Sequence, residues 1–167
     1  MDSAFIADAV APNAIIPTVL VGVLAVLLLA GAVSDLRSRS ISNWLNGAIA
    51  LLAVPFWFAL GLDVWPTMAI QLGLGLATFA LFAIFFALGA MGGGDVKMIA
   101  ALALWLPAGM LISTLLIMAI AGGLLTVFVW LWHKARKTAI GDGVPYGVAI
   151  AIAGFWAINQ HYINQFA

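Results

Sequence analysis

The run from residue 14 to residue 34 contains no charged side chain and is rich in Leu, Val and Ala. A helix of about 20 apolar residues is long enough to cross the hydrocarbon core of a membrane. The rest of the chain has the same character: 66% of its residues are apolar and only 7% are charged. A soluble domain carries about 25% charged residues. We therefore expect an all-α, polytopic membrane protein with one membrane-embedded domain over residues 1–167.

The apolar runs predict six spanning helices. They lie at about residues 14–34, 44–60, 67–88, 95–106, 108–132 and 145–163. The fourth is short because Pro107 and Gly109 interrupt it. About 12 helical residues reach only ~18 Å, whereas the hydrocarbon core is about 30 Å thick.

A few residues within the predicted spans suggest how the helices pack. Small residues allow close helix approach, which we expect at Gly73, Gly75 and Ala77. Gln71 is expected to make an interhelical hydrogen bond rather than to take part in chemistry. Aromatic residues near the predicted span ends are interpreted as membrane-interface anchors: Trp44, Trp65, Trp105, Trp132 and Tyr146.

The basic residues predict the orientation. With six spans, the first, third and fifth loops lie on one side of the membrane. Every Lys and Arg falls in or beside these loops: Arg37, Arg39, Lys97, Lys134, Arg136 and Lys137. Basic loops face the cytoplasm, so both termini are expected outside. The acidic start of the chain, with no basic residue before Arg37, argues against a cleavable signal peptide.

The composition excludes several classes of function. The chain has no Cys and only two His, at 133 and 161. A disulfide framework, a thiolate zinc site and a cysteine nucleophile are therefore excluded, and we expect no metal and no cofactor. No basic patch is large enough to indicate nucleic-acid binding. The oligomeric state is left open.

Two aspartates are predicted to meet at the cytoplasmic face. Asp35 follows the first span and Asp95 begins the fourth, so both return to the same side. Two facing carboxyl groups in such a place cannot both ionise easily, and one keeps a proton. An aspartic protease uses that state. From the helix dipoles we expect the proton on Asp35 and the charge on Asp95, which lies at a helix N-terminus.

The residues alone leave other interpretations open. Asp95 suits an N-cap after a glycine turn, and Asp35 suits a surface loop beside a span. Lys97 either pairs with Asp95 or extends to the membrane interface. Asp142, between two glycines, is interpreted as a turn residue. The three glycines 92–94 allow close approach of another backbone, such as a substrate strand.

These motifs resemble a known family. Gly92-x-Gly94-Asp95 is similar to the G-x-G-D signature of intramembrane aspartic proteases. The longer string over residues 92–98, Gly-Gly-Gly-Asp-Val-Lys-Met, resembles the type IV prepilin peptidases. Residues 35–44 match the segment after that family's first catalytic Asp, with Ser42 where Pro is common. Residues 144–151 resemble its last helix, so the resemblance extends over about residues 15–160.

The resemblance implies a membrane aspartic endopeptidase, with Asp35 and Asp95 as the catalytic pair and Gly92, Gly94 and Lys97 in support. Such enzymes act in pilus biogenesis and protein secretion at the bacterial inner membrane. They cut the basic leader from prepilins after a Gly, on the cytoplasmic side. The expected partners are a prepilin-like substrate with a hydrophobic N-terminal helix and the membrane lipid.

One difference between this chain and larger members of the family limits the activities that we expect. Larger members of the family carry Cys pairs that bind zinc, and they also N-methylate the product. This chain has no Cys, so it resembles the small, peptidase-only members of Flp/Tad systems, and we predict no N-methyltransferase activity.

A proton-coupled small transporter subunit is the alternative function, since paired acids also serve proton relays. A third possible function, as an assembly scaffold without chemistry, would leave the glycine loop at residues 92–94 unexplained.

Overall fold

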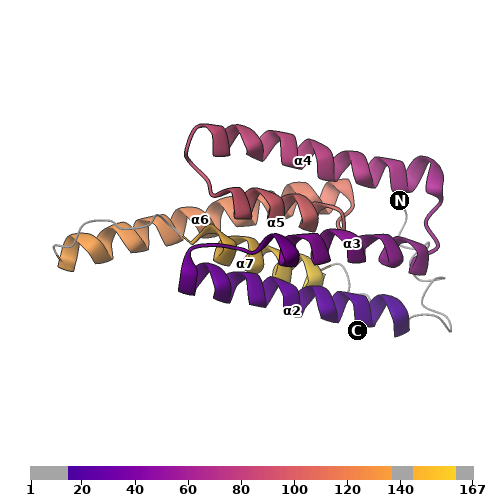
Figure 1. The fold of residues 1–167 in the computed structure, drawn as a ribbon, viewed down its shortest axis with the longest axis horizontal. Helices are drawn as coiled ribbons and strands as arrows, with labels where there is room; N and C mark the ends of the chain where they lie inside the picture. The colour runs from indigo at the N-terminus through magenta and orange to yellow at the C-terminus, as the bar shows by residue number, and fades with distance from the viewer. Residues whose placement is uncertain (1–14, 137–144, 161–167) are drawn as a thin grey trace.

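The computed structural model describes residues 15–136 and 145–160, and every regular element in these ranges is helical. The elements in order are α2 (Ile15–Ser38), α3 (Asn43–Ala59), the π-helical turn η1 (Val64–Met68), α4 (Ala69–Ala87), α5 (Gly93–Ala103), α6 (Ala108–Arg136) and α7 (Tyr146–Ile158). The helices run along the long axis of an elongated bundle (Figure 1). The predicted all-α membrane fold is confirmed.

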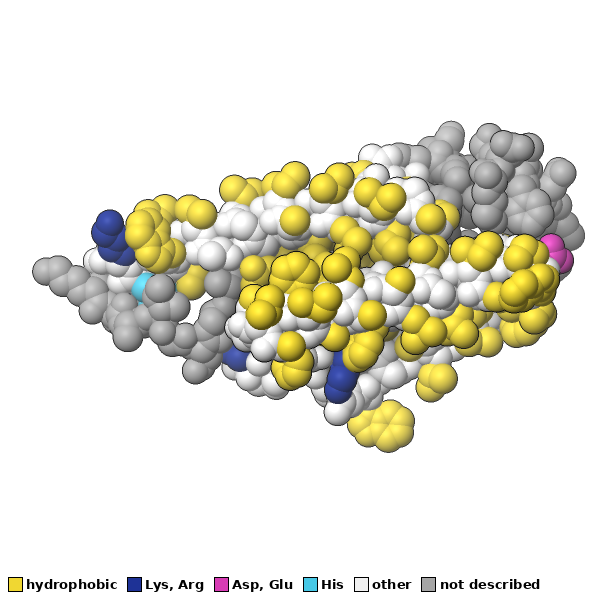
Figure 2. Space-filling model, turned by 90° about the horizontal axis from the view of Figure 1, so that it is seen from above, with side chains coloured by type: hydrophobic (Ala, Val, Ile, Leu, Met, Phe, Trp, Pro, Cys, Tyr) yellow, Lys and Arg dark blue, Asp and Glu magenta, His cyan; other side chains and the backbone are white. Residues whose placement is uncertain are grey.

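Three of the described helical segments are long and apolar enough to cross a membrane: Ile15–Ser38, Val64–Ala87 and Ala108–Arg136. Large apolar side chains are exposed along them, as expected for surfaces that face lipid. In Figure 2, apolar side chains cover the length of the visible face, and the coloured acidic atoms appear only at one end.

The short helix α5 forms the centre of the bundle. It packs against α3, α4 and α7 (Figure 1). Every residue from Asp95 to Ala103 except Lys97 is buried. Its 11 residues span about 16 Å at 1.5 Å per residue, so α5 ends inside the bundle. The predicted short fourth helix is thus confirmed, and its brevity creates a helix end that needs hydrogen-bond donors.

Side chains of α3 and α4 supply these donors. Gln71 Nε2 donates to the carbonyl oxygens of Ala103 and Leu106, at 3.0 and 2.6 Å. Trp57 Nε1 donates to Leu104 O at 2.8 Å. The last carbonyls of a helix have no partner within that helix, and in an apolar environment each unsatisfied one is costly. The interpretation of Gln71 as an interhelical hydrogen-bonding residue agrees with these contacts.

Two packing expectations were wrong in detail. Trp105 is not an interface anchor: it is buried, stacks on Phe56 and donates from Nε1 to Ile49 O at 2.9 Å. The reason is that α5 ends in the bundle rather than at a membrane surface. Of the two glycines of α4, only Gly75 meets another helix closely. A methyl group there would lie 2.3 Å from Leu104, whereas Gly73 faces open space.

Two helices continue past their predicted ends. α6 reaches Arg136 and projects beyond the rest of the bundle (Figure 1). Its projecting part carries cation–π pairs, with Lys134 Nζ 4.9 Å from the Trp130 ring and Arg136 Cζ 4.2 Å from the Trp132 ring. α2 continues to Ser38. Asp35 is therefore inside the last turn of a helix rather than in a loop after it.

Candidate active site

Asp35 is held by the last described helix. Its side chain is 5% exposed, on the face of α2 that packs against α7. The backbone N–H of Gly147, in the first turn of α7, donates to Asp35 Oδ2 at 2.8 Å. A buried carboxyl group with a specific backbone donor is not the solvated loop residue that the surface-loop interpretation required.

Asp95 lies in the first turn of α5 and is 8% exposed. It is not an N-cap: the N-cap position is Gly92, and Asp95 is the third residue of the helix. Its carboxyl group lies close enough to that of Asp35 for the two to interact electrostatically, and Asp95 Oδ2 lies against Gly92. Asp95 Oδ1 is nevertheless buried without a hydrogen-bond partner. The structure thus brings Asp35 and Asp95 together around the start of α7.

Three glycines make this approach possible. A methyl group on Gly92 would lie 2.8 Å from Asp95 Oδ2, and one on Gly147 would lie 2.9 Å from Asp35 Oδ2. A methyl group on Gly94 would lie 3.2 Å from the backbone N and O of Ile41. Side chains at these positions would displace the carboxyl groups or the segment after α2. The absence of side chains at Gly92 and Gly94 therefore allows the start of α5 to pack closely at this site.

The middle glycine differs from its neighbours. A methyl group on Gly93 would meet only the ring of Phe86, at 3.2 Å, and that side chain is exposed. The ring has room to move, whereas the backbone of Ile41 does not. Gly92 and Gly94 are therefore the two positions at which a side chain would clash, the first with the Asp95 carboxyl group and the second with the backbone of Ile41.

Asn46 connects α3 to the glycine loop. Its side chain is 4% exposed, and Nδ2 donates to Gly94 O at 3.0 Å. Its Oδ1 is buried without a partner. This contact fixes the position of the residue before Asp95.

Lys97 contacts α3 rather than a carboxyl group. Its Nζ donates to Asn43 Oδ1 at 2.7 Å, and the side chain is exposed. Of the two interpretations of Lys97, extension toward the surface fits this geometry. Lys97 holds the start of α5 against the start of α3, beside the contact that Asn46 makes.

Hydrogen bonding distinguishes the two carboxyl groups. The bond from Gly147 stabilises an ionised Asp35, because a donor to a carboxylate favours its charged form. The buried, unpartnered Oδ1 of Asp95 makes a charge there more costly. The position of the shared proton stays a prediction: these two contacts favour the charge on Asp35, whereas helix dipoles favour it on Asp95. The expectation from helix dipoles did not include a donor from α7.

Sequence reasoning missed the roles of Gly147 and Asn46. Gly147 belongs to the segment that resembles the family's last helix, but its contact with Asp35 depends on how α7 packs against α2. Asn46 was detectable as a polar side chain within an apolar helix, a feature that often marks a buried hydrogen bond. Asp142 lies outside the described residues. Within the described ranges, no group of three His, Asp or Glu side chains gathers as a metal site would require.

The fold and the site define an all-helical membrane protein with two buried carboxyl groups brought together by three helices. Residues 22–127 match the type IV leader peptidase family. Because this match covers more than half of the chain, the protein belongs to that family, as the motifs predicted. The matched range includes Asp35 and Asp95, whereas Gly147 lies beyond it. No curated protein and no solved structure matches the chain.

Proposed function

We propose that this peptidase is an aspartic endopeptidase that removes the basic leader from prepilin-like substrates, after a Gly and at the cytoplasmic face of the membrane. The observation that carries the proposal is the convergence of Asp35 and Asp95. They lie on separate helices, both are buried, their carboxyl groups interact with each other, and the Gly147 N–H donates to Asp35 Oδ2. Two interacting carboxyl groups that share one proton suit general acid–base hydrolysis.

The contacts suggest a role for each aspartate. Asp35, as the anion, takes a proton from a water molecule while the water oxygen attacks the scissile carbonyl carbon. Asp95, as the acid, gives its proton to the carbonyl oxygen, which yields a neutral tetrahedral diol. Asp95 then takes a proton back from a diol hydroxyl as the C–N bond breaks. Asp35 passes its proton to the departing amine, and the resting state is restored.

The cytoplasmic orientation rests on charge. The basic residues Arg37, Arg39 and Lys97 lie near the two aspartates in the chain, and Lys134 and Arg136 lie at the projecting end of α6. Cytoplasmic loops of membrane proteins are enriched in such residues. We propose on this basis a multi-pass protein of the bacterial inner membrane with both termini outside.

We also propose that the protein does not N-methylate its product. The methylating members of the family carry Cys pairs, and this chain has no Cys. The purified protein should transfer no labelled methyl group from S-adenosylmethionine to a mature pilin. Transfer by this protein alone would contradict the proposal.

Co-expression with a candidate prepilin tests the function. The wild-type protein should convert the precursor to the mature size on a gel, and Asp35→Asn and Asp95→Asn should not. Asp63→Asn is the matched control, because Asp63 is exposed at the far end of α3. All four proteins should insert into the membrane in equal amounts, and chelators should have no effect. Normal processing by either site variant would refute the aspartic mechanism.

A further inference from the structure

Ile41 lies in the short connection between α2 and α3, yet its side chain is only 7% exposed and belongs to the core of the bundle. The chain turns at Arg39, which adopts the left-handed backbone conformation with a φ of 51°. Residues other than Gly seldom adopt this conformation. The turn after α2 therefore returns the chain to the interior of the bundle, and Ile41 is the residue that becomes buried there.

Ile41 contacts two of the glycines that surround the aspartates. Its backbone N and O and its Cβ each lie 3.2 Å from the point where a methyl group on Gly94 would be. Its Cδ1 lies 2.9 Å from the point where a methyl group on Gly147 would be, and Asp35 Oδ2 lies 2.9 Å from that same point. The tip of the Ile41 side chain is therefore beside the Asp35 carboxyl group, against the start of α7.

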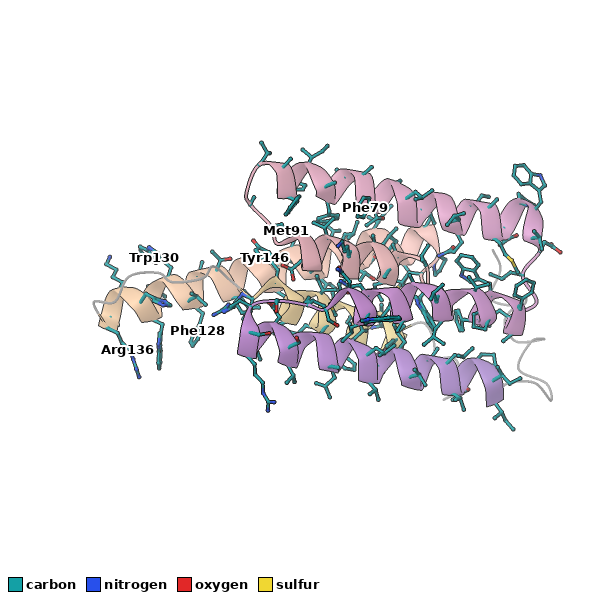
Figure 3. The ribbon with its side chains drawn as sticks, in the orientation of Figure 1. Phe79, Met91, Phe128, Trp130, Arg136 and Tyr146 are labelled. Carbon is teal, nitrogen blue, oxygen red and sulfur yellow. The ribbon has the colours of Figure 1, made fainter. Side chains whose placement is uncertain are left out.

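The two helices that Ile41 touches, α5 and α7, begin toward the same end of the bundle. Figure 3 labels Met91, just before α5, and Tyr146, the first residue of α7, at this end. The two helices also pack against each other. A side chain placed between their first turns therefore sets the distance between them.

Hydrogen bonds hold the residues on both sides of Ile41. Before it, Ser34 Oγ donates to the carbonyl oxygen of Ser40 at 2.7 Å. After it, Ser42 caps α3, since its Oγ accepts the backbone N–H of Leu45 at 3.3 Å. Ile is also branched at Cβ, which restricts the rotamers of its side chain. Both the backbone and the side chain of Ile41 are therefore held in place, as a residue that positions others requires.

We infer that Ile41 is a positioning residue for the two aspartates. It keeps the start of α7, and with it the Gly147 N–H, at a fixed distance from the start of α5. This inference rests on the proposed function and adds to it a residue that takes no part in proton transfer, because an apolar side chain neither donates nor accepts a proton. Its effect on the reaction passes through the alignment of Asp35 and Asp95.

Ile41→Val tests the inference, because it removes Cδ1, the atom that lies against Gly147, and leaves the Cβ that faces Gly94. A misplacement of about 1 Å at a reacting centre lowers the rate by about 100-fold. Loss of one methyl group permits a smaller shift, so kcat should fall by about tenfold while KM stays unchanged. Ile41→Leu, which conserves the side-chain volume and its reach, should retain most of the wild-type kcat.

Ile49→Val is the matched control. Ile49 is fully buried in α3 near the other end of α5, where its carbonyl oxygen accepts a hydrogen bond from Trp105 Nε1. The substitution removes the same methyl group from the core at a distance from the aspartates, so kcat per folded protein should match that of the wild type. Equal kcat values in Ile41→Val and Ile49→Val would overturn the inference, and so would a change in KM alone.

Hydrogen exchange gives a second readout that requires no substrate. The Gly147 N–H lies in the first turn of α7 and has Asp35 Oδ2 as its acceptor. The first N–H groups of a helix have no partner within that helix, so its protection depends on this contact. In the protein in detergent, NMR should show exchange of this N–H at least about threefold faster in Ile41→Val and unchanged in Ile49→Val. Equal exchange in the two variants would overturn the inference.

The two measurements separate the inference from the function beneath it. Cleavage by the wild-type protein, with equal kcat and equal exchange in the two Val variants, would remove the role of Ile41 and leave the peptidase. Selectively faster exchange at Gly147 in Ile41→Val, without cleavage by the wild-type protein, would support the positioning contact and contradict the endopeptidase assignment.

Discussion

At Gly92, a methyl group would lie 2.8 Å from Asp95 Oδ2, whereas at Gly93 it would meet only a movable ring. We therefore predict that Gly92→Ala lowers the cleavage rate by about 100-fold, because a shift of about 1 Å in a catalytic group has an effect of that size. Gly93→Ala should retain most of the activity. The measurement is leader removal by equal amounts of folded protein, and equal losses in the two variants would contradict this account of the motif.

The interaction between Asp35 and Asp95 also predicts a pH dependence. Cleavage requires one ionised and one protonated carboxyl group, so the rate should fall at low pH, when the anion gains a proton. It should fall again at high pH, when the shared proton is lost. The bell-shaped profile belongs to the pair rather than to either residue. A rate that depended on pH on one side only would indicate that a single carboxyl group acts.

At the scale of the helix, α5 depends on donors from its neighbours because it ends inside the bundle. Gln71→Leu would leave two buried carbonyl oxygens, of Ala103 and Leu106, without their side-chain donor. We predict a loss of about 1–2 kcal/mol in the free energy of unfolding. Thermal unfolding in detergent measures it.

Ser113→Ala is the matched control for Gln71→Leu. Ser113 Oγ reaches only Gly109 O, within its own helix, at 3.4 Å. This substitution should therefore change stability little. Equal stability of the two variants would mean that water or lipid headgroups reach the end of α5.

At the scale of the molecule, the sequence predicts the order of helices because each apolar run is long and its polar breaks are clear. Pro107 and Gly109 likewise predict the short fourth helix. The packing of that helix was not predictable from local pattern. Trp105 becomes a core residue because α5 is surrounded on several sides, and of the two glycines of α4 only Gly75 meets another helix closely.

Some residues of the candidate site could likewise be predicted from the sequence, and others could not. Asp35, Asp95 and the required glycines 92 and 94 are detectable in the sequence, because charge in an apolar chain is conspicuous. Gly147 and Asn46 act through contacts between helices far apart in the chain. The position of the shared proton stays a prediction, because helix dipoles and these contacts favour opposite arrangements.

The central claim is that Asp35 and Asp95 act as one unit, and the rates of the single and double Asp→Asn variants test it most directly. Purified wild-type protein, both single variants and the double variant would be assayed with the same prepilin in the same detergent. Residues that act as a unit have non-additive effects. We predict that each single variant is about as inactive as the double variant. Partial losses that multiply in the double variant, or near-normal cleavage by either single variant, would contradict the claim.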